Sequence, residues 1–396
     1  MARSKYEFVS LANFIYYSII EAYVSLGLVF FFRRFKIIGK ENVSRTKPVL
    51  FAVNHQSSFV DPILAASFTS RRPWFITRAG VFNSAFARWF FNSVHMLPIY
   101  RMNDGVNIKE ANKATFQRSR EILKTGGAML IFPEGNHGMR KRLRAPLKKG
   151  FARIALQADA ETDFQLGVDI VPTGMFYEHS TKFRSDCSMN YGKPINTKDY
   201  AELYRDDANE ALNQITKDLA VEMAKVLVDI QSLENYDALE KEWQEARPKE
   251  SDMAKRLNTD KALTEKLNNG ERLEPIKRKE KKASRVLIGL VGLPIFLFGA
   301  FNNLLTYLAT KYVLKNMVKD PHFYHSIMYA CGLVALPIFT FIQACVLYFV
   351  LGNLNITILY FFTTPFFGLL AYDYYDIVFR GEVRPQASKL MNGYGY

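Results

Sequence analysis

The stretch Phe51–Pro62 reads FAVNHQSSFVDP, and it joins an apolar, strand-like run to an imidazole, two hydroxyls and a carboxylate. His55 is suited to take a proton from a hydroxyl, because its unperturbed pKa is about 6.5. A carboxylate on the other ring nitrogen fixes the tautomer and stabilises the imidazolium. Because residues six apart do not share a face of a regular helix, the turn must fold back before a helix brings Asp61 to His55. We expect Ser57 or Ser58 to cap that helix.

Three further apolar runs end in polar or basic residues, and together they predict an α/β sheet. LPIYR closes at Arg101, LIFPEG continues into Glu134 and Gly135, and VDIVPTG places Pro172 at the predicted end of a strand. Strand, turn, helix and strand again is the α/β pattern. In such sheets, ligands bind beyond the carboxyl ends of the strands. These strand ends are therefore predicted to form one site.

A basic loop follows Gly135 and holds candidate anion ligands. Its sequence, NHGMRKRLRAPLKKG, includes Arg140 and Lys149. Planar guanidinium groups suit phosphate oxygens and lysine adds a point charge. Arg101, Arg140 and Lys149 are therefore candidate ligands for an anionic group. Gly135 allows the backbone to approach a ligand closely.

Composition indicates a membrane protein with an anionic partner. The 396 residues carry a net charge of +14, and 49% are apolar, including 32 Phe and 21 Tyr. Aromatic enrichment suits a membrane interface, and a basic excess favours anionic partners. The three Cys and six His show no metal-ligand spacing. No metal and no cofactor are expected.

Four zones divide the chain: an apolar amino-terminal membrane helix or helix pair (1–35), the α/β domain (36–200), a charged helical linker (201–283) and a carboxyl-terminal helical membrane region (284–396). The fourth zone contains a predicted hairpin near 327–372, with a tight GNLN turn. Basic residues flank 286–310 on both sides, and Asn302 and Asn303 are costly inside a bilayer unless partnered. We therefore expect 286–310 to enter and return, or to lie in the interface. Positive flanks place the α/β domain on the cytoplasmic side of the cell membrane.

The order of these motifs resembles the glycerophospholipid acyltransferase family over roughly residues 36–200. The motifs that carry the resemblance are Asn54, His55 and Asp61, then Arg101, then Phe132–Gly135, then Pro172. Two details differ from the family's commonest pattern. The spacer between His55 and Asp61 has five residues rather than four, which is similar to a branch that includes glycerol-3-phosphate and dihydroxyacetone-phosphate acyltransferases. Asn136 and His137 replace a frequent Thr-Arg, so Arg140 is the candidate to supply that charge.

The resemblance implies direct acyl transfer without an acyl-enzyme. The donor would be acyl-CoA or acyl carrier protein, and the acceptor a phosphorylated glycerol, first of all 1-acyl-sn-glycerol 3-phosphate. Glycerol 3-phosphate, dihydroxyacetone phosphate and a lysoaminolipid stay open as acceptors. The resemblance implies that His55 is the base, that Asp61 orients it, and that backbone amides near Gly135 or Thr173 are candidate oxyanion donors. It also implies that Arg101, helped by Arg140 or Lys149, holds the acceptor's phosphate. Glu134 either accepts a hydrogen bond from the glycerol hydroxyl or braces its loop.

Three other classes compete with this hypothesis. A serine hydrolase is disfavoured because the chain has no Gly-x-Ser-x-Gly elbow. A non-enzymatic membrane lipid-binding protein explains the charge and the apolar segments but leaves the ordered motifs unexplained. A nucleic-acid binder explains only the charge, so nucleic acid is not expected as a partner. The partners expected are membrane lipid, the phosphorylated acceptor and the thioester donor.

Overall fold

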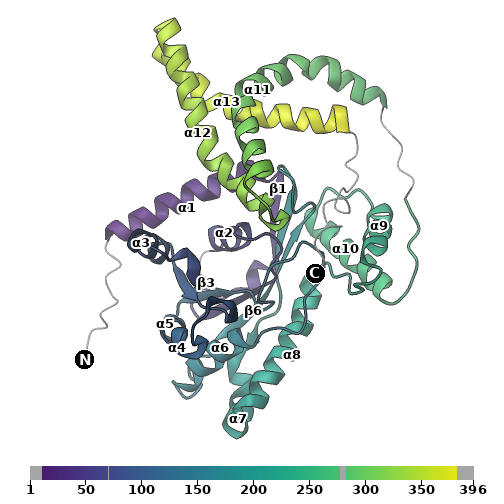
Figure 1. Ribbon diagram of the computed structural model, residues 1–396. Coiled ribbons are helices and arrows are strands. Elements are labelled where there is room, and N and C mark those ends of the chain that lie inside the picture. The colour runs from purple at the N-terminus through teal and green to yellow at the C-terminus, as the bar shows by residue number, and fades with distance from the viewer. Residues whose placement is uncertain (1–10, 70, 277–281, 381–396) are drawn as a thin grey trace.

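A mixed eight-stranded sheet forms the centre of the protein. The computed structural model describes residues 11–69, 71–276 and 282–380. Within them the strands lie in the order β1-β7-β6-β2-β5-β3-β4, and β8 pairs with β6 off this path. The strands are β1 (Arg34–Ile38), β2 (Val49–Val53), β3 (Trp74–Arg78), β4 (Met96–Ile99), β5 (Ala128–Ile131), β6 (Asp169–Tyr177), β7 (Asp186–Tyr191) and β8 (Ile195–Asn196). The predicted α/β class is confirmed (Figure 1).

The parallel strands of this sheet end at one edge, which is where the polar motifs follow them. Strand β2 is parallel to β5 and β6, and β3 is parallel to β4 and β5. Only β7 and β8 run antiparallel to their described neighbour β6. His55, Arg101 and Glu134 each follow the end of a parallel strand by two or three residues. The sheet therefore gathers motifs that are far apart in the sequence.

One prediction about the strands is wrong. Pro172 does not end a strand, because it pairs in register with Ala52 and β6 continues to Tyr177. Its carbonyl accepts a hydrogen bond from Gly192 N at 2.8 Å. Apolar and β-branched neighbours keep the strand fully buried beyond the proline. Pro172 is therefore a residue of the sheet interior.

Helices cover both faces of the sheet. One face is packed by α5 (Lys113–Lys124), α6 (Gly150–Ala160) and α8 (Ala208–Val226), which bury Ile122, Phe151 and Leu219 in one apolar cluster. The other face is packed by α2 (Val60–Ser67), the end of α1 (Leu11–Phe31) and the start of α12 (Tyr324–Leu351). Shorter helices are η1 (Lys40–Asn42), η2 (Ala79–Val81), α3 (Ala85–Ser93), η3 (Met102–Asp104), α4 (Ile108–Ala111), η4 (Thr197–Tyr200) and α7 (Ala201–Asp206). Parts of the predicted membrane zones thus belong to the core of the α/β unit.

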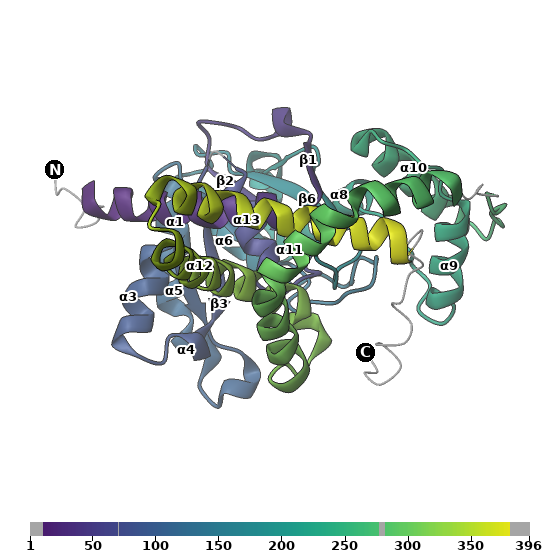
Figure 2. The same ribbon diagram turned by 90° about the horizontal axis from the view of Figure 1, so that it is seen from above.

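The stretch interpreted as a charged linker is folded and packed. Helix α8 buries Leu212, Ile215, Leu219 and Met223 at helical spacing. Helices α9 (Tyr236–Ala246) and α10 (Met253–Asn268) enclose Trp243 in a small core of their own with Phe176 from β6. Figure 2 shows these two helices beside the edge of the α/β unit.

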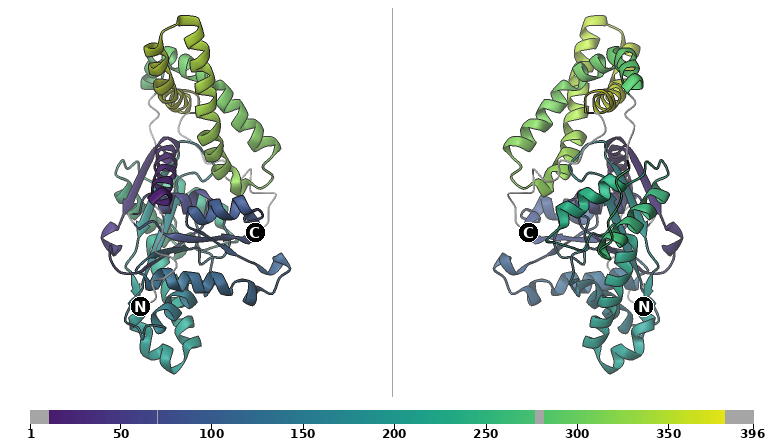
Figure 3. Two further views of the ribbon diagram at one scale, coloured as in Figure 1. Left: turned by 90° about the vertical axis from the view of Figure 1, so that its left-hand side faces the viewer. Right: turned by 90° about the vertical axis from the view of Figure 1, so that its right-hand side faces the viewer.

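In the part of the chain that the structure describes, four helices are long and apolar enough to cross a membrane: Phe14–Phe31, Arg285–Asn316, Pro321–Leu351 and Leu354–Arg380. They correspond to α1, α11 (Lys282–Asn316), η5 (Pro321–Phe323) with α12, and α13 (Leu354–Tyr375) with η6 (Asp376–Arg380). Within the described residues the amino-terminal zone is a single helix. Helices α11, α12 and α13 pack together and rise from one side of the α/β unit, as Figures 1 and 3 agree.

The predicted hairpin is present, since only Gly352 and Asn353 separate α12 from α13. The stretch 286–310 lies in α11, one continuous helix that curves in Figure 1 and contains Pro294. Its two asparagines are partnered: Tyr360 OH donates to Asn302 Oδ1 at 2.6 Å, and Asn303 Nδ2 donates to Thr364 O at 3.2 Å. The cost of unpartnered asparagines therefore no longer argues against depth in the bilayer.

Candidate active site

The predicted pair of His55 and Asp61 is formed. His55 Nδ1 lies 2.8 Å from Asp61 Oδ2. The same oxygen accepts hydrogen bonds from the backbone N–H groups of Gln56 and Ser57, each at 2.7 Å. The chain thus wraps around a fully buried carboxylate, which explains how residues six apart meet. Tyr177 OH donates to the other carboxylate oxygen, Asp61 Oδ1.

The contact with Asp61 defines which nitrogen of His55 is available for chemistry. With Nδ1 facing the carboxylate, the proton is assigned to Nδ1 and the lone pair to Nε2. The ring stacks on Phe132 with centroids 3.9 Å apart, and its side chain keeps 15% exposure. No hydrogen bond to His55 Nε2 occurs among the described residues. His55 is therefore oriented as a general base with an open nitrogen.

Buried Tyr177 and Asn54 fix the floor of the site. Burial, together with the neighbouring charge of Asp61, raises the pKa of Tyr177 well above its usual range, so its hydroxyl stays a donor. Asn54 clamps the backbone of β6: its Nδ2 donates to Met175 O at 3.1 Å and its Oδ1 accepts from Met175 N at 2.6 Å. Tyr177 was missed in the sequence because it follows Asp61 by more than a hundred residues.

Glu134 is placed as a brace. Its two carboxylate oxygens accept hydrogen bonds from His55 N at 2.7 Å, Arg144 N at 3.0 Å and the Arg144 guanidinium at 2.6 Å. The residue is 6% exposed. Burial raises the pKa of Glu134, and Arg144 opposes that shift. Two roles were expected for Glu134, bracing its loop or binding the glycerol hydroxyl. The contacts observed connect two loops, as a bracing role requires.

The basic loop distributes its charges differently from the expectation. The Arg140 guanidinium lies over the Tyr236 ring, 4.8 Å from its centroid. Lys149 Nζ donates to Asn213 Oδ1 on α8. Gly135 has φ +80°, a backbone conformation that favours glycine, and its N–H donates to Phe132 O at 3.1 Å. Arg140 and Lys149 are thus engaged by α9 and α8, and the Gly135 amide is not free to stabilise an oxyanion.

Arg101 has a basic companion that the sequence analysis overlooked. Arg78 ends β3, and Arg101 follows the neighbouring parallel strand β4. Burial, then the nearby charge of Arg78, lowers the pKa of Arg101. Among the described residues, neither guanidinium forms an ion pair shorter than 4.0 Å. A basic residue at the end of WFITR was the available signal. Two guanidinium groups at the same sheet edge suit an anionic ligand.

The start of α12 docks on the catalytic loop. Val60 N, in the first turn of α2, donates to Ser326 Oγ at 3.1 Å, and Ser326 Oγ donates to Ser57 O at 3.2 Å. Ser57 Oγ lies 3.1 Å from His325 Nδ1. The prediction that Ser57 or Ser58 caps α2 is wrong: α2 has no side-chain cap from its own N-cap residue, and Ser326 takes that place. His325, in the first turn of α12, is fully buried.

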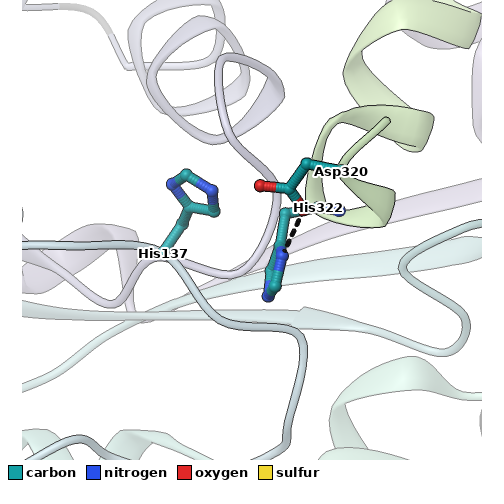
Figure 4. Close-up of side chains that lie close together, drawn as sticks. All are labelled: His137, Asp320 and His322. Carbon is teal, nitrogen blue, oxygen red and sulfur yellow. Dashed lines mark hydrogen bonds and ion pairs between the residues drawn. The ribbon is translucent and has the colours of Figure 1, made fainter. Parts of the chain in front are cut away.

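His137 belongs to a second polar cluster, with Asp320 and His322. Its ring lies 5.5 Å from that of His55 and 5.1 Å from that of His322, measured between centroids. Burial, then repulsion from His55 and His322, lowers the pKa of His137 to about 4. The ring is therefore neutral at pH 7. Figure 4 shows His137, Asp320 and His322 approaching one another from two segments.

A groove of about 2510 Å³ lies between the membrane helices and the α/β unit. Apolar side chains such as Phe30, Leu333 and Phe366 line it, together with the basic Lys182 and Lys315. Its lining does not include His55 but reaches Phe31 and Tyr329, whose rings pack beside each other. The groove offers an apolar volume next to basic groups.

Comparison with known proteins gives one family. Residues 34–175 match the model of the Acyltransferase family. Over 143 residues the chain is 36% identical to glycerol-3-phosphate O-acyltransferase 2 of Saccharomyces cerevisiae, which covers 35% of this chain and 19% of the yeast protein. Over 144 residues it is 32% identical to a 1-acyl-sn-glycerol-3-phosphate acyltransferase of Chlamydomonas reinhardtii, covering 36% of this chain and 38% of the algal one.

The solved structure of the 1-acyl-sn-glycerophosphate acyltransferase PlsC from Thermotoga maritima is also similar. It aligns with a TM-score of 0.37 at 17% identity, covering 55% of this chain and 84% of that one. The chain spans well under half the length of the yeast and algal relatives.

Proposed function

We propose that this chain, whose residues 34–175 form a domain of the Acyltransferase family, transfers a fatty acyl group from a thioester to a hydroxyl of a glycerol-phosphate acceptor. The observation that carries the proposal is the contact of 2.8 Å between His55 Nδ1 and Asp61 Oδ2 at the end of β2. It leaves Nε2 of His55 directed away from the carboxylate. The names of the relatives, which are acyltransferases of glycerol 3-phosphate and 1-acylglycerol 3-phosphate, support the same reaction class.

In the proposed reaction, His55 Nε2 takes the proton of the acceptor hydroxyl as its oxygen attacks the thioester carbonyl. A carbon–oxygen bond forms, the carbon–sulfur bond breaks, and the proton on His55 passes to the leaving thiolate. Asp61 stabilises the imidazolium and holds the ring. General base catalysis of this kind contributes roughly 10²–10⁴-fold, and positioning of the two substrates supplies much of the rest. No cofactor takes part in these steps, and acyl-CoA or acyl carrier protein is the co-substrate.

We assign the acceptor's phosphate to Arg101 and Arg78. Both follow parallel strands of the same sheet edge that carries His55. We do not assign the phosphate to three other candidates. Arg140 lies over Tyr236, Lys149 is bonded to Asn213, and Pro172 lies in the sheet interior. The favoured acceptor is 1-acyl-sn-glycerol 3-phosphate, since an acylated acceptor partitions into a membrane and the groove beside α1 and α12 offers apolar walls. Glycerol 3-phosphate is the second candidate, favoured by the five-residue spacer and the yeast relative.

We place the α/β unit on the cytoplasmic side of the cell membrane. The chain on both sides of α11 is bound to this unit: Ile276 N donates to Glu245 O at 3.0 Å, and Ser58 Oγ donates to His322 O at 3.1 Å. Basic residues flank α11 on both sides, which supports a path for 286–310 without a net crossing. Lysine and arginine at such flanks favour the cytoplasm.

The test is an assay of the full chain in phospholipid vesicles. Each acceptor is offered separately with labelled acyl-CoA or acyl carrier protein, and the product is identified by mass. We expect product from the wild type and from His95→Asn, which removes an imidazole at a position of positive φ that asparagine tolerates. His55→Ala is expected to lose at least about a hundredfold of the rate. If His55→Ala transfers acyl groups at a tenth of the wild-type rate or more, His55 is not the base. If no acceptor is acylated by the folded wild type, a lipid-binding function replaces the enzyme.

A further inference from the structure

Three potential metal ligands meet where the membrane region joins the catalytic loops. His137 lies in the loop after Glu134, whereas Asp320 and His322 lie in the short connection between α11 and α12. One ligand atom from each lies within 4.8 Å of the other two (Figure 4). The spacing of the three Cys and six His predicts no metal site, and His137 is far from Asp320 and His322 in the chain.

The donor set has the chemistry of a zinc site. Two imidazoles and one carboxylate are ligands that Zn²⁺ accepts, and three protein ligands leave a position for water or another oxygen. Bonds of about 2.0–2.2 Å place two ligand atoms roughly 3.4 Å apart, so the more distant groups must approach by roughly 1 Å. Asp320 Oδ1 and His322 Nδ1, which are 2.6 Å apart, must separate. Rotation of exposed Asp320, whose side chain is 46% accessible, allows that movement and an entry path.

Second contacts orient the ligands. Asp320 Oδ1 lies 2.6 Å from His322 Nδ1 and accepts a hydrogen bond from His322 N at 3.0 Å. This contact holds the carboxylate and the imidazole side by side, and binding of an ion replaces it with two metal–ligand bonds. The His137 ring also contacts Phe323, with centroids 5.3 Å apart. These contacts hold two rings and a carboxylate around one space.

We propose that His137, Asp320 and His322 bind one divalent transition-metal ion of the zinc type. The ion joins the loop that carries Glu134 to the connection whose next residues, His325 and Ser326, hold the loop of His55 and Asp61. It thereby fastens the membrane helices to the active site. The site does not rest on the proposed acyl transfer, and its test does not use activity.

The experiment measures binding to full-length protein without an affinity tag, in detergent and after treatment with a chelator. Co²⁺ is titrated in first, its visible d–d absorption is recorded, and Zn²⁺ then competes for the site. We expect one equivalent per chain and intense bands of four- or five-coordinate cobalt that Zn²⁺ removes. His137→Ala and His322→Ala are expected to weaken binding at least about tenfold, a loss that even outer contacts of metal sites produce. Asp320→Asn is expected to do the same.

His95→Asn is the matched control, since it removes a histidine that stacks on Trp74, in another part of the fold. It is expected to bind as the wild type does. Thermal melting separates a lost ligand from a lost fold: Zn²⁺ is expected to raise the melting temperature of the wild type and His95→Asn but not of the ligand variants. Equal binding by the wild type and by a His137→Ala, His322→Ala double variant would overturn the proposal. So would a wild type that binds no Co²⁺, which would leave the three groups as a hydrogen-bonded cluster.

Discussion

Ser326 Oγ accepts a hydrogen bond from Val60 N at 3.1 Å, so a side chain of the carboxyl-terminal membrane region shares the first amide of the helix that carries Asp61 with Ser57 O, which lies 3.0 Å from the same nitrogen. The same hydroxyl donates to Ser57 O at 3.2 Å. One residue thus connects both ends of the turn between His55 and Asp61. The membrane helices are consequently part of the support of the catalytic pair as well as an anchor.

Ser326→Ala tests this support. Loss of a helix cap lowers the free energy of unfolding by about 0.5–2 kcal/mol. If the His55–Asp61 turn shifts, a rise of about 1 kcal/mol in the activation barrier lowers kcat roughly fivefold, while KM changes little. Steady-state kinetics and thermal melting of the full chain measure both effects. Thr363→Ala is the control, because that hydroxyl bonds only Leu359 O of its own helix. An unchanged kcat in a destabilised Ser326→Ala would limit Ser326 to holding the fold.

Glu134→Gln separates a bracing role from a substrate contact. The amide cannot accept hydrogen bonds at both positions, and the Arg144 guanidinium loses its charge partner, so we expect a loss of about 3 kcal/mol in unfolding free energy. Chemical denaturation in detergent provides the measurement. Glu161→Gln, an exposed carboxylate paired with Arg120 and Lys124, is expected to change stability by less than about 1 kcal/mol. A fully stable Glu134→Gln with a raised KM for the acceptor would show that Glu134 binds the hydroxyl.

Arg101→Ala and Arg78→Ala are expected to raise KM for the phosphorylated acceptor roughly tenfold or more, with a smaller effect on the thioester donor. Arg101→Lys is expected to restore the wild-type KM for the acceptor only in part, because lysine lacks the planar guanidinium group that binds two phosphate oxygens at once. Because the two guanidinium groups face one ligand, the double variant is expected to be non-additive. Arg205→Ala, which breaks an exposed pair with Asp163 on another part of the surface, is the control. Equal changes in the KM of both substrates would remove these arginines from the phosphate site.

Glu178 gives the fold a defined pH dependence. Burial alone would raise its pKa, but Arg247 and then Arg256 outweigh burial and lower it to about 2, from 4.5 for a free group. A carboxylate with a depressed folded pKa stabilises the fold above the unfolded pKa, and this contribution is lost as pH falls through the folded pKa. Glu178→Gln is therefore expected to be up to about 3 kcal/mol less stable than the wild type at pH 7. Melting curves at pH 7 and near pH 3 are compared for both proteins. The difference in stability between the wild type and Glu178→Gln is expected to be smaller at the lower pH. An equal difference at both pH values would contradict a depressed pKa for Glu178.

Thiol labelling tests the membrane path. Cysteines are placed singly at Lys315, Asn353 and Lys389 in a parent without Cys187, Cys331 and Cys345, and an impermeant reagent is applied to intact cells. Only the cysteine at position 353, in the turn between α12 and α13, is expected to react. Lys389 lies outside the described residues, so its position is a prediction from charge alone. Labelling at position 315 would show that α11 crosses the bilayer.

The sequence by itself determined the α/β class, the three strands that end before His55, Arg101 and Glu134, and the pair of His55 and Asp61. These features depend on local pattern: apolar runs of strand length, and polar residues directly after them. Parallel strands end at one edge whatever their order, so the site could be assembled from sequence without knowing which strands are neighbours. The apolar spacing of α8 and the short turn of the hairpin are local in the same sense.

Only the tertiary structure decided which partners, distant in the sequence, each polar residue contacts. Glu134 is bonded to Arg144 and His55 N, and Lys149 is bonded to Asn213 of α8. Pro172 stays inside a strand because paired neighbours on both sides outweigh its missing N–H. Tyr177, Ser326 and the cluster of His137, Asp320 and His322 arise from segments that meet only after folding. Their positions follow from packing of the whole chain, which no local pattern encodes.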